Sequence, residues 1–420
     1  VNGDIPRSPA SSLKLLTGAA ALHTLGTNYR FTTSLYYDGT ITNGILDGNV
    51  YIKGTGDPTF QYKDFYNFAS SLKKIGINRI NGYVLADDSV FKGPTRSKGV
   101  VPHEEDEYYA AASTAITMSQ DSNYYAGTIN FTVVGSWVGG APYYGAGNSF
   151  SGLQVVNKAK TVRKGARNTL SIKRASGSNQ IVIAGNIPVG STVKKVITMP
   201  NPTTNSLITF TEAMRKVGIT FKQPYLVAYR KVPDTATFVT SKQSITLGEL
   251  YPHFMQTSNN VIADTLLKTM GYAVYGVGDY THGIKVLKNH GTELGLNMNE
   301  STIVDGSGLS SLNKVSPNQL SLLMNKVRNT PTYDLFYDGL IVGGHPDSLK
   351  SRTLKNRFTE WNTRYHLLGK TGYITGTHSL TGIAQGFYSR NLYLFSVMSE
   401  NYGGSIKSID NVMKHVILKH

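Results

Sequence analysis

The chain has 420 residues, of which 40% are hydrophobic and 16% are charged. This length exceeds the size at which a single hydrophobic core stops growing, so we expect two or three domains. No apolar run approaches the roughly 20 residues that a membrane-spanning helix needs, and the absence of cysteine excludes disulfides, thiolate metal sites and a cysteine nucleophile.

The net charge of +16 favours anionic partners, either nucleic acid, anionic lipid or the acidic polymers of a bacterial surface. Lysine and arginine are scattered, and no run of five or more occurs. This pattern argues against a nucleic-acid-binding arm. No signal peptide is visible at the first residues, so a secreted protein would be represented here in processed form.

The first half of the chain is predicted to pass from helix to strands. A helix is expected from Ser8, which can cap it, to Leu22. Between residues 31 and 93, short apolar segments separated by turns predict strands, with one helix over residues 63–74. Strand-like runs continue to about residue 200, which predicts an inserted, mostly β region.

Helical spacing returns in the second half, at residues 207–217 and 261–270. Strands are predicted near the end of the chain, at residues 380–387 and 392–398. Helix-rich ends are therefore expected to flank a β-rich middle.

Three short motifs suggest a serine nucleophile. The first is a Ser-Xaa-Xaa-Lys pair, Ser11 and Lys14. In the first turn of a helix, the serine N–H lacks an intrahelical partner and the lysine lies one turn away on the same face. The same spacing occurs at Ser70 and Lys73, but that pair is expected at the end of a helix, so we favour Ser11.

The second motif is Ser258 with Asn260, which precedes an apolar helical run at residues 261–267. These residue types are also typical helix caps, and both interpretations stay open.

The third motif comprises Lys370, Thr371 and Gly372. A phosphate-binding loop is excluded because Arg364 stands where that loop needs glycine, and a strand follows where the loop needs a helix. On a strand edge, the lysine and threonine can bind a carboxylate, while the glycine admits a substrate backbone.

A hard-cation site is a weaker alternative at residues 103–107, His-Glu-Glu-Asp-Glu, where a solvated acidic loop is the simpler interpretation. The other histidines show no ligand spacing, and we predict neither a metal nor a cofactor.

Together these motifs make the sequence resemble the low-molecular-mass class C penicillin-binding proteins, the D-alanyl-D-alanine carboxypeptidase/endopeptidase family of penicillin-binding protein 4 type. The likeness spans nearly the whole chain. The segments that match family signatures, in order, are residues 9–14, 54–58, 258–264, 305–310 and 370–372.

The resemblance implies an α/β fold with β-rich insertions: a transpeptidase/β-lactamase-like domain, with a mixed sheet and a helical cluster, carrying two smaller inserted domains. The expected catalytic domain comprises residues 1–31 and 198–420. Residues 32–60 and 134–197 would form the inserted β-rich domain II, and residues 61–133 the inserted domain III.

The resemblance also implies the residue roles. Ser11 would be the nucleophile and Lys14 its base, Ser258 would pass a proton to the leaving group, and Asn260 would hold the substrate amide. Burial and a neighbouring cation such as Lys370 would favour the neutral form of Lys14.

In the same scheme, Lys370, Thr371 and Gly372 would bind substrate, with the first two holding its terminal carboxylate. The backbone N–H groups of Ser11 and Tyr373 would form the oxyanion hole. Tyr373 replaces the small hydroxyl residue that is usual in the family.

The implied function is a serine DD-peptidase of peptidoglycan metabolism, acting through an acyl-enzyme on stem peptides and inhibited covalently by β-lactams. It would work outside the cytoplasm, with anionic wall polymers as further partners and no nucleic acid. A serine β-lactamase-like hydrolase and a non-catalytic wall-binding relative are the alternatives. Only ten residues precede Ser11, so we also expect an incomplete or processed chain.

Overall fold

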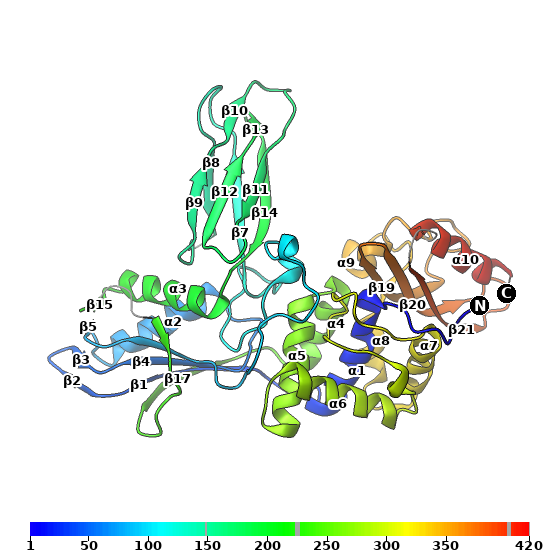
Figure 1. Cartoon of the computed structure of the whole chain (residues 1–420), viewed down its shortest axis with the longest axis horizontal. Helices are drawn as coiled ribbons and strands as arrows, with labels where there is room; N and C mark the ends of the chain where they lie inside the picture. The colour runs from blue at the N-terminus through cyan, green and yellow to red at the C-terminus, as the bar shows by residue number, and fades with distance from the viewer. Residues whose placement is uncertain (148, 223–226, 401–404, 420) are drawn as a thin grey trace. The chain divides into compact units, whose positions relative to one another are not determined.

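The computed structural model describes residues 1–147, 149–222, 227–400 and 405–419. The chain divides into two compact units. The first contains residues 1–30, 92–100 and 245–420, and the second contains residues 31–91 and 101–244. Figure 1 labels most of their helices and strands. Within the described residues, no helix has the length and hydropathy needed to cross a membrane.

The first unit contains an antiparallel sheet in the order β18-β19-β20-β21. Its strands are β18 (Ile341–Val342), β19 (Leu367–Ile374), β20 (Thr377–Gln385) and β21 (Leu392–Glu400). Helix α10 (Ile406–Lys419) packs on β20 and β21. Its buried side chains recur every fourth residue, at Ile409, Met413 and Ile417, so one face of the helix covers the sheet.

A helical cluster completes the first unit. Its helices are η1 (Ala10–Leu13), α1 (Lys14–Leu25), α4 (Leu247–Thr257), α5 (Asn260–Tyr275), α6 (Tyr280–Glu293), η4 (Met298–Glu300), α7 (Pro317–Lys326), η5 (Val327–Asn329), α8 (Tyr333–Asp338), α9 (Ser348–Ser351) and η6 (Arg352–Leu354). Helix α1 is buried all round from Lys14 to Leu22, because α4, α5, α6 and α7 contact it.

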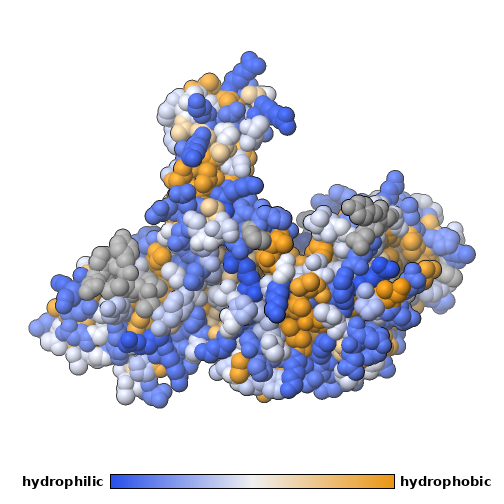
Figure 2. All heavy atoms as spheres, viewed as in Figure 1, coloured by the Kyte–Doolittle hydropathy of each residue, from blue (hydrophilic) through white to orange (hydrophobic). Residues whose placement is uncertain are grey.

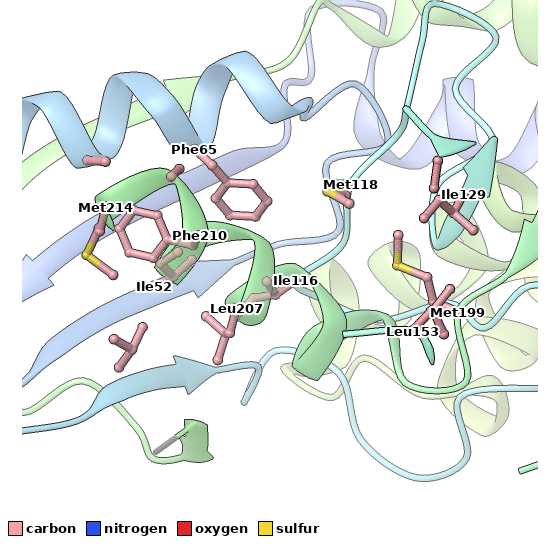
Figure 3. Packing of buried hydrophobic residues seen from close by; sticks show 14 of the residues in the cluster. Ile52, Phe65, Ile116, Met118, Ile129, Leu153, Met199, Leu207, Phe210 and Met214 are labelled. Atoms are coloured by element: carbon pink, nitrogen blue, oxygen red, sulfur yellow. The ribbon is translucent and has the colours of Figure 1, made fainter. Parts of the chain in front are cut away.

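Outside residues 128–198, the second unit has two sheets, in the orders β16-β6-β4-β1-β17 and β15-β5-β3-β2. The elements are β1 (Thr32–Tyr37), β2 (Thr40–Thr42), β3 (Ile45–Asp47), β4 (Val50–Gly54), α2 (Tyr62–Lys74), β5 (Arg79–Ile80), β6 (Val84–Asp87), α3 (Pro202–Lys216), β15 (Thr220–Phe221), β16 (Val227–Tyr229) and β17 (Thr237–Gln243). Figure 3 shows Phe65 of α2 beside Phe210 of α3 in its core, and their rings stack at 5.7 Å.

The β lobe, residues 128–198, is the remaining part of the second unit and has three small sheets. Its strands are β7 (Thr128–Val134), β8 (Tyr143–Ala146), β9 (Gln154–Asn157), β10 (Lys160–Val162), β11 (Ser171–Arg174), β12 (Gln180–Ala184), β13 (Asn186–Pro188) and β14 (Thr192–Thr198). Two short helices, η2 (Pro102–Glu104) and η3 (Tyr108–Ala110), precede it.

Several predicted elements match the structure, including the helix at residues 63–74 and the last two strands. The helix predicted at residues 207–217 is also present, as α3, but it belongs to the second unit and not to the predicted catalytic domain.

The predicted domain boundaries need correction. Strand β4 pairs with β6 across the boundary predicted at residue 60, and β7 pairs with β14 across the one predicted at residue 134. Residues 198–244 belong to the second unit and residues 92–100 to the first. Pairing between strands far apart in sequence decides these boundaries, and local composition does not reveal it.

Candidate active site

Ser11 and Lys14 lie one turn apart where η1 passes into α1. The Lys14 side chain is fully buried, with 0% exposed. Its Nζ donates hydrogen bonds to Ser11 Oγ at 2.9 Å, Asn260 Oδ1 at 2.6 Å and the Ser307 carbonyl at 2.6 Å. The first motif and part of the second therefore meet around one amine.

Burial lowers the pKa of Lys14 from its usual 10.5 to about 7, while the carboxylates of Asp264 and Asp305 oppose this shift. The predicted importance of burial is confirmed. The charges that act most on Lys14 are these two carboxylates and not the predicted neighbouring cation, Lys370.

Asp264 and Asp305 also fix the loop that contains Gly306 and Gly308. Asp264 accepts a hydrogen bond from the Gly306 N–H at 3.0 Å, and Asp305 accepts one from the Gly308 N–H at 2.7 Å. Gly308 has a φ of +76°, and a Cβ there would lie 1.9 Å from the Ala10 carbonyl oxygen. Glycine thus lets this loop pack directly on η1, beside the serine.

The second motif occupies the connection between α4 and α5. Ser258 ends α4 in the left-handed region, with a φ of +56°. Asn259 caps α5 by accepting a hydrogen bond from the Ile262 N–H at 3.1 Å. The N-cap of α5 is therefore Asn259, which lies between the two residues of the motif, while Ser258 Oγ accepts a hydrogen bond from Lys370 Nζ at 2.8 Å.

The third motif lies on β19. Lys370 is buried, and burial together with nearby Lys14 holds its pKa well below the usual range. The Thr371 and Thr353 hydroxyls share a hydrogen bond of 2.7 Å. A Cβ at Gly372 would lie 2.8 Å from the Ser11 nitrogen, so this glycine permits the close approach of β19 to η1.

Tyr373 differs from its neighbours on β19 because its side chain is 65% exposed. Its ring lies 5.0 Å from the ring of His378, across the strand pair.

The structure brings together Ser11, Lys14 and Asn260, and joins Ser258 to Lys370.

The near-copy of the first motif is arranged differently. Ser70 Oγ donates to the Tyr66 carbonyl at 2.9 Å, and Lys73 Nζ donates to Asn78 Oδ1 at 2.5 Å.

The predicted cap at Ser8 is wrong, because Pro9 occupies the N-cap of η1 and makes no side-chain cap bond.

The acidic segment at residues 103–107 is engaged by a cation of the protein itself. Lys195 Nζ lies 3.3 Å from Asp106 Oδ2 and 3.0 Å from Glu107 Oε1. Two carboxylates of the segment are therefore paired with a lysine, and Asp106 is buried, so the segment differs from the predicted solvated loop.

Three contacts of two buried serines, Ser12 and Ser379, were not predicted. Ser12 Oγ donates to the Lys370 carbonyl at 3.2 Å and lies 2.8 Å from Ser379 Oγ. Ser379 Oγ in turn donates to the Pro9 carbonyl at 2.6 Å. These two buried hydroxyls tie η1 to β19 and β20, and no local sequence pattern marks them.

The antiparallel sheet, the helical cluster and a serine beside a buried lysine define a transpeptidase-like serine peptidase. The chain belongs to the D-Ala-D-Ala carboxypeptidase 3 (S13) family, whose model matches residues 1–417. The protein is therefore a serine-type D-alanyl-D-alanine carboxypeptidase, as the sequence analysis predicted.

Relatives and solved structures agree. The chain is 28% identical over 400 residues to a D-alanyl-D-alanine carboxypeptidase of Actinomadura sp. (strain R39), covering 94% of this chain and 74% of that protein. It is 25% identical over 407 residues to D-alanyl-D-alanine carboxypeptidase DacB of Haemophilus influenzae, covering 91% and 78%.

The crystal structure of penicillin binding protein 4 (dacB) from Haemophilus influenzae matches with a TM-score of 0.82 and 21% identity, covering 99% of this chain and 92% of that chain. A structure of that protein complexed with a β-lactam matches with a TM-score of 0.75 and 21% identity, covering 97% and 88%. The predicted fold class is confirmed.

Proposed function

We propose that Ser11 attacks the terminal D-Ala-D-Ala bond of peptidoglycan stem peptides, with Lys14 as its general base. The observation that supports this most strongly is the position of a fully buried lysine, with a pKa of about 7, 2.9 Å from the serine hydroxyl. A base with a pKa near the working pH combines a useful neutral fraction with useful basicity.

The surroundings of Lys14 suit proton transfer from Ser11. A neutral amine has two N–H groups and one lone pair. Asn260 Oδ1 and the Ser307 carbonyl accept hydrogen bonds from these two N–H groups. In the neutral form the 2.9 Å contact with Ser11 therefore reverses its direction, and the hydroxyl donates to the lone pair of Lys14. The amine is thus oriented before substrate arrives.

In the proposed reaction, Ser11 Oγ bonds to the carbonyl carbon of the penultimate D-alanine and its proton passes to Lys14. The C–N bond then breaks as Ser258 passes its hydroxyl proton to the departing amine of D-alanine and takes up in turn the proton that Lys14 received. Water hydrolyses the ester and restores Ser11. The backbone N–H groups of Ser11 and Tyr373 would stabilise the oxyanion.

The other predicted residues would position the substrate. Asn260 would hold the substrate amide, and Lys370 and Thr371 its terminal carboxylate, with Gly372 admitting the backbone. Burial disfavours the charged form of Lys370, so an incoming carboxylate would supply the missing counter-charge.

Two substrates test this proposal. We expect release of D-alanine from an N-acylated D-Ala-D-Ala peptide, and a penicillin adduct that persists while unbound penicillin is removed. Rapid turnover of penicillin without D-alanine release would instead favour the β-lactamase-like alternative. Cleavage of a D-Ala-diamino acid cross-link, measured in parallel, decides whether the enzyme is also an endopeptidase.

We further propose that the enzyme works outside the cytoplasm and binds anionic wall polymers through the β lobe. Residues 122–200 contain nine Lys or Arg residues and neither Asp nor Glu. Arg174 is buried, and Lys195 pairs with carboxylates. The other seven cations are exposed: Lys158, Lys160, Arg163, Lys164, Arg167, Lys173 and Lys194. Hydrophilic residues project from the tip of this lobe in Figure 2.

A matched pair of variants tests the role of the β lobe. Reversing Arg163 and Lys164 to Glu is expected to weaken binding to poly(glycerol phosphate) by about fivefold or more at low salt, because each cation faces no competing carboxylate within the lobe. Lys63→Glu with Lys74→Glu changes the net charge equally, and both lysines are exposed on α2. Equal losses in the two variants, measured by sedimentation with the polymer, would contradict a specific role for the lobe. Equal affinity for a DNA oligomer of similar charge would also contradict it.

A further inference from the structure

Two histidines and a glutamate meet where the last turns of α1 and α6 lie together. The rings of His23 (α1) and His290 (α6) stack with their centroids 4.5 Å apart. Glu293 Oε2 lies 3.8 Å from His23 Nε2 and 3.8 Å from His290 Nδ1. One ligand atom from each residue can be chosen so that all three atoms lie within 4.8 Å of one another.

His290 supplies the fixed part of this cluster. Its side chain is only 5% exposed, and its Nδ1 has no hydrogen-bond partner among the described residues. A buried ring nitrogen without a hydrogen-bond partner destabilises the fold, and a ligand bound to that nitrogen would remove this cost in free energy. The side chains of His23 and Glu293 are 61% and 64% exposed, so both are free of close packing that would prevent adjustment.

The three residues line a cavity of about 440 Å³. Most of its remaining wall is apolar, including Ala19, Leu22, Val327 and Phe336. An ion held by the three side chains would therefore keep one coordination position facing this cavity, which water or a small ligand could fill.

We propose that His23, His290 and Glu293 bind a divalent transition metal of the zinc class. Two imidazoles and a carboxylate are a ligand set that Zn²⁺ commonly uses. A tetrahedral site with bonds of roughly 2.0–2.2 Å has ligand atoms about 3.4 Å apart, so the side chains must close by roughly an ångström. His23 and Glu293 make that movement, including a rotation of the His23 ring out of the stack, while His290 stays in place.

Metal binding at this position joins α1 to α6. Helix α1 begins at Lys14, so the ion fixes the far end of the helix that carries the proposed base. The ion is remote from the reaction, and its role is to stabilise the first unit. Its binding is thus measurable whether or not Ser11 is the nucleophile.

Titration of the full chain, freed of any affinity tag and treated with chelator, tests the site. With ZnCl₂ alone, calorimetry is expected to show one equivalent bound with a Kd tighter than about 100 μM. His23→Gln and Glu293→Gln each weaken binding by at least about tenfold. His415→Gln is the control, because His415 is an exposed helical histidine outside the cluster.

Cobalt gives a second measurement, because tetrahedral Co²⁺ absorbs visible light more strongly than hydrated Co²⁺. The wild type and His415→Gln should show this absorption, and His23→Gln should lose it. Weaker zinc binding in the wild type, or a loss in His23→Gln no greater than in the control, would overturn the proposal. D-alanine release by the two ligand variants should stay within about twofold of wild type, because neither residue contacts the proposed catalytic groups.

Discussion

Replacing Ser11 with alanine should lower the rate of D-alanine release by about 10⁴-fold or more, because no acyl-enzyme can form without the nucleophile. The Ser11 hydroxyl contacts Lys14, which keeps its bonds to Asn260 and Ser307, so the fold should survive the change. Steady-state kinetics and the thermal midpoint of the variant measure the two effects separately.

Ser70→Ala is the matched control. Ser70 has the same spacing to a lysine, but its hydroxyl bonds to the Tyr66 carbonyl on α2. Its activity should match that of the wild type. Comparable activity in Ser11→Ala and the wild type would exclude Ser11 as the nucleophile.

Replacing Lys14 with methionine should lower the acylation rate by about 10²- to 10⁴-fold, the usual contribution of a general base. Methionine fills a similar volume in a fully buried site and has no proton acceptor of comparable basicity. Rapid mixing of the enzyme with a chromogenic β-lactam measures this rate directly.

The wild-type pH profile provides an independent measurement. The pKa of Lys14 is about 7, so the amine is protonated below that pH and cannot accept the Ser11 proton. The acylation rate should therefore rise about tenfold per pH unit below 7 and level off above it. This limb should disappear in Lys14→Met and persist in Lys73→Met. A profile through pH 7 that is unchanged in Lys14→Met would contradict the role of Lys14 as base.

Much of the proposed site could be predicted from local sequence. A serine and a lysine three residues apart meet on any helix, so spacing placed Ser11 near Lys14. Ser70 and Lys73 have the same spacing, but they make exposed contacts at the surface. Burial, and not the spacing to a serine, lowers the pKa of Lys14. The position of Ser11 at the start of a helix distinguished this pair from Ser70 and Lys73. That criterion gave the right pair because the helix that follows Ser11, α1, is also buried in its cluster.

Long-range features could not be predicted in the same way. Asp264 and Asp305 stand 41 residues apart, and their joint effect on Lys14 depends on the packing of α1, α5 and the loop that contains Gly306. The pairing of β4 with β6 and of β7 with β14 likewise joins segments that composition assigned to different domains. Such contacts are properties of the folded chain.

Mass spectrometry of the penicillin-treated enzyme tests the central claim most directly. After proteolysis, the peptide that contains Ser11 should carry the added mass of one intact penicillin, because opening the β-lactam ring expels no leaving group. The adduct should be absent from Ser11→Ala and present in Ser70→Ala. An adduct on Ser70, or persistent labelling of Ser11→Ala at another serine, would contradict the assignment of Ser11 as the nucleophile.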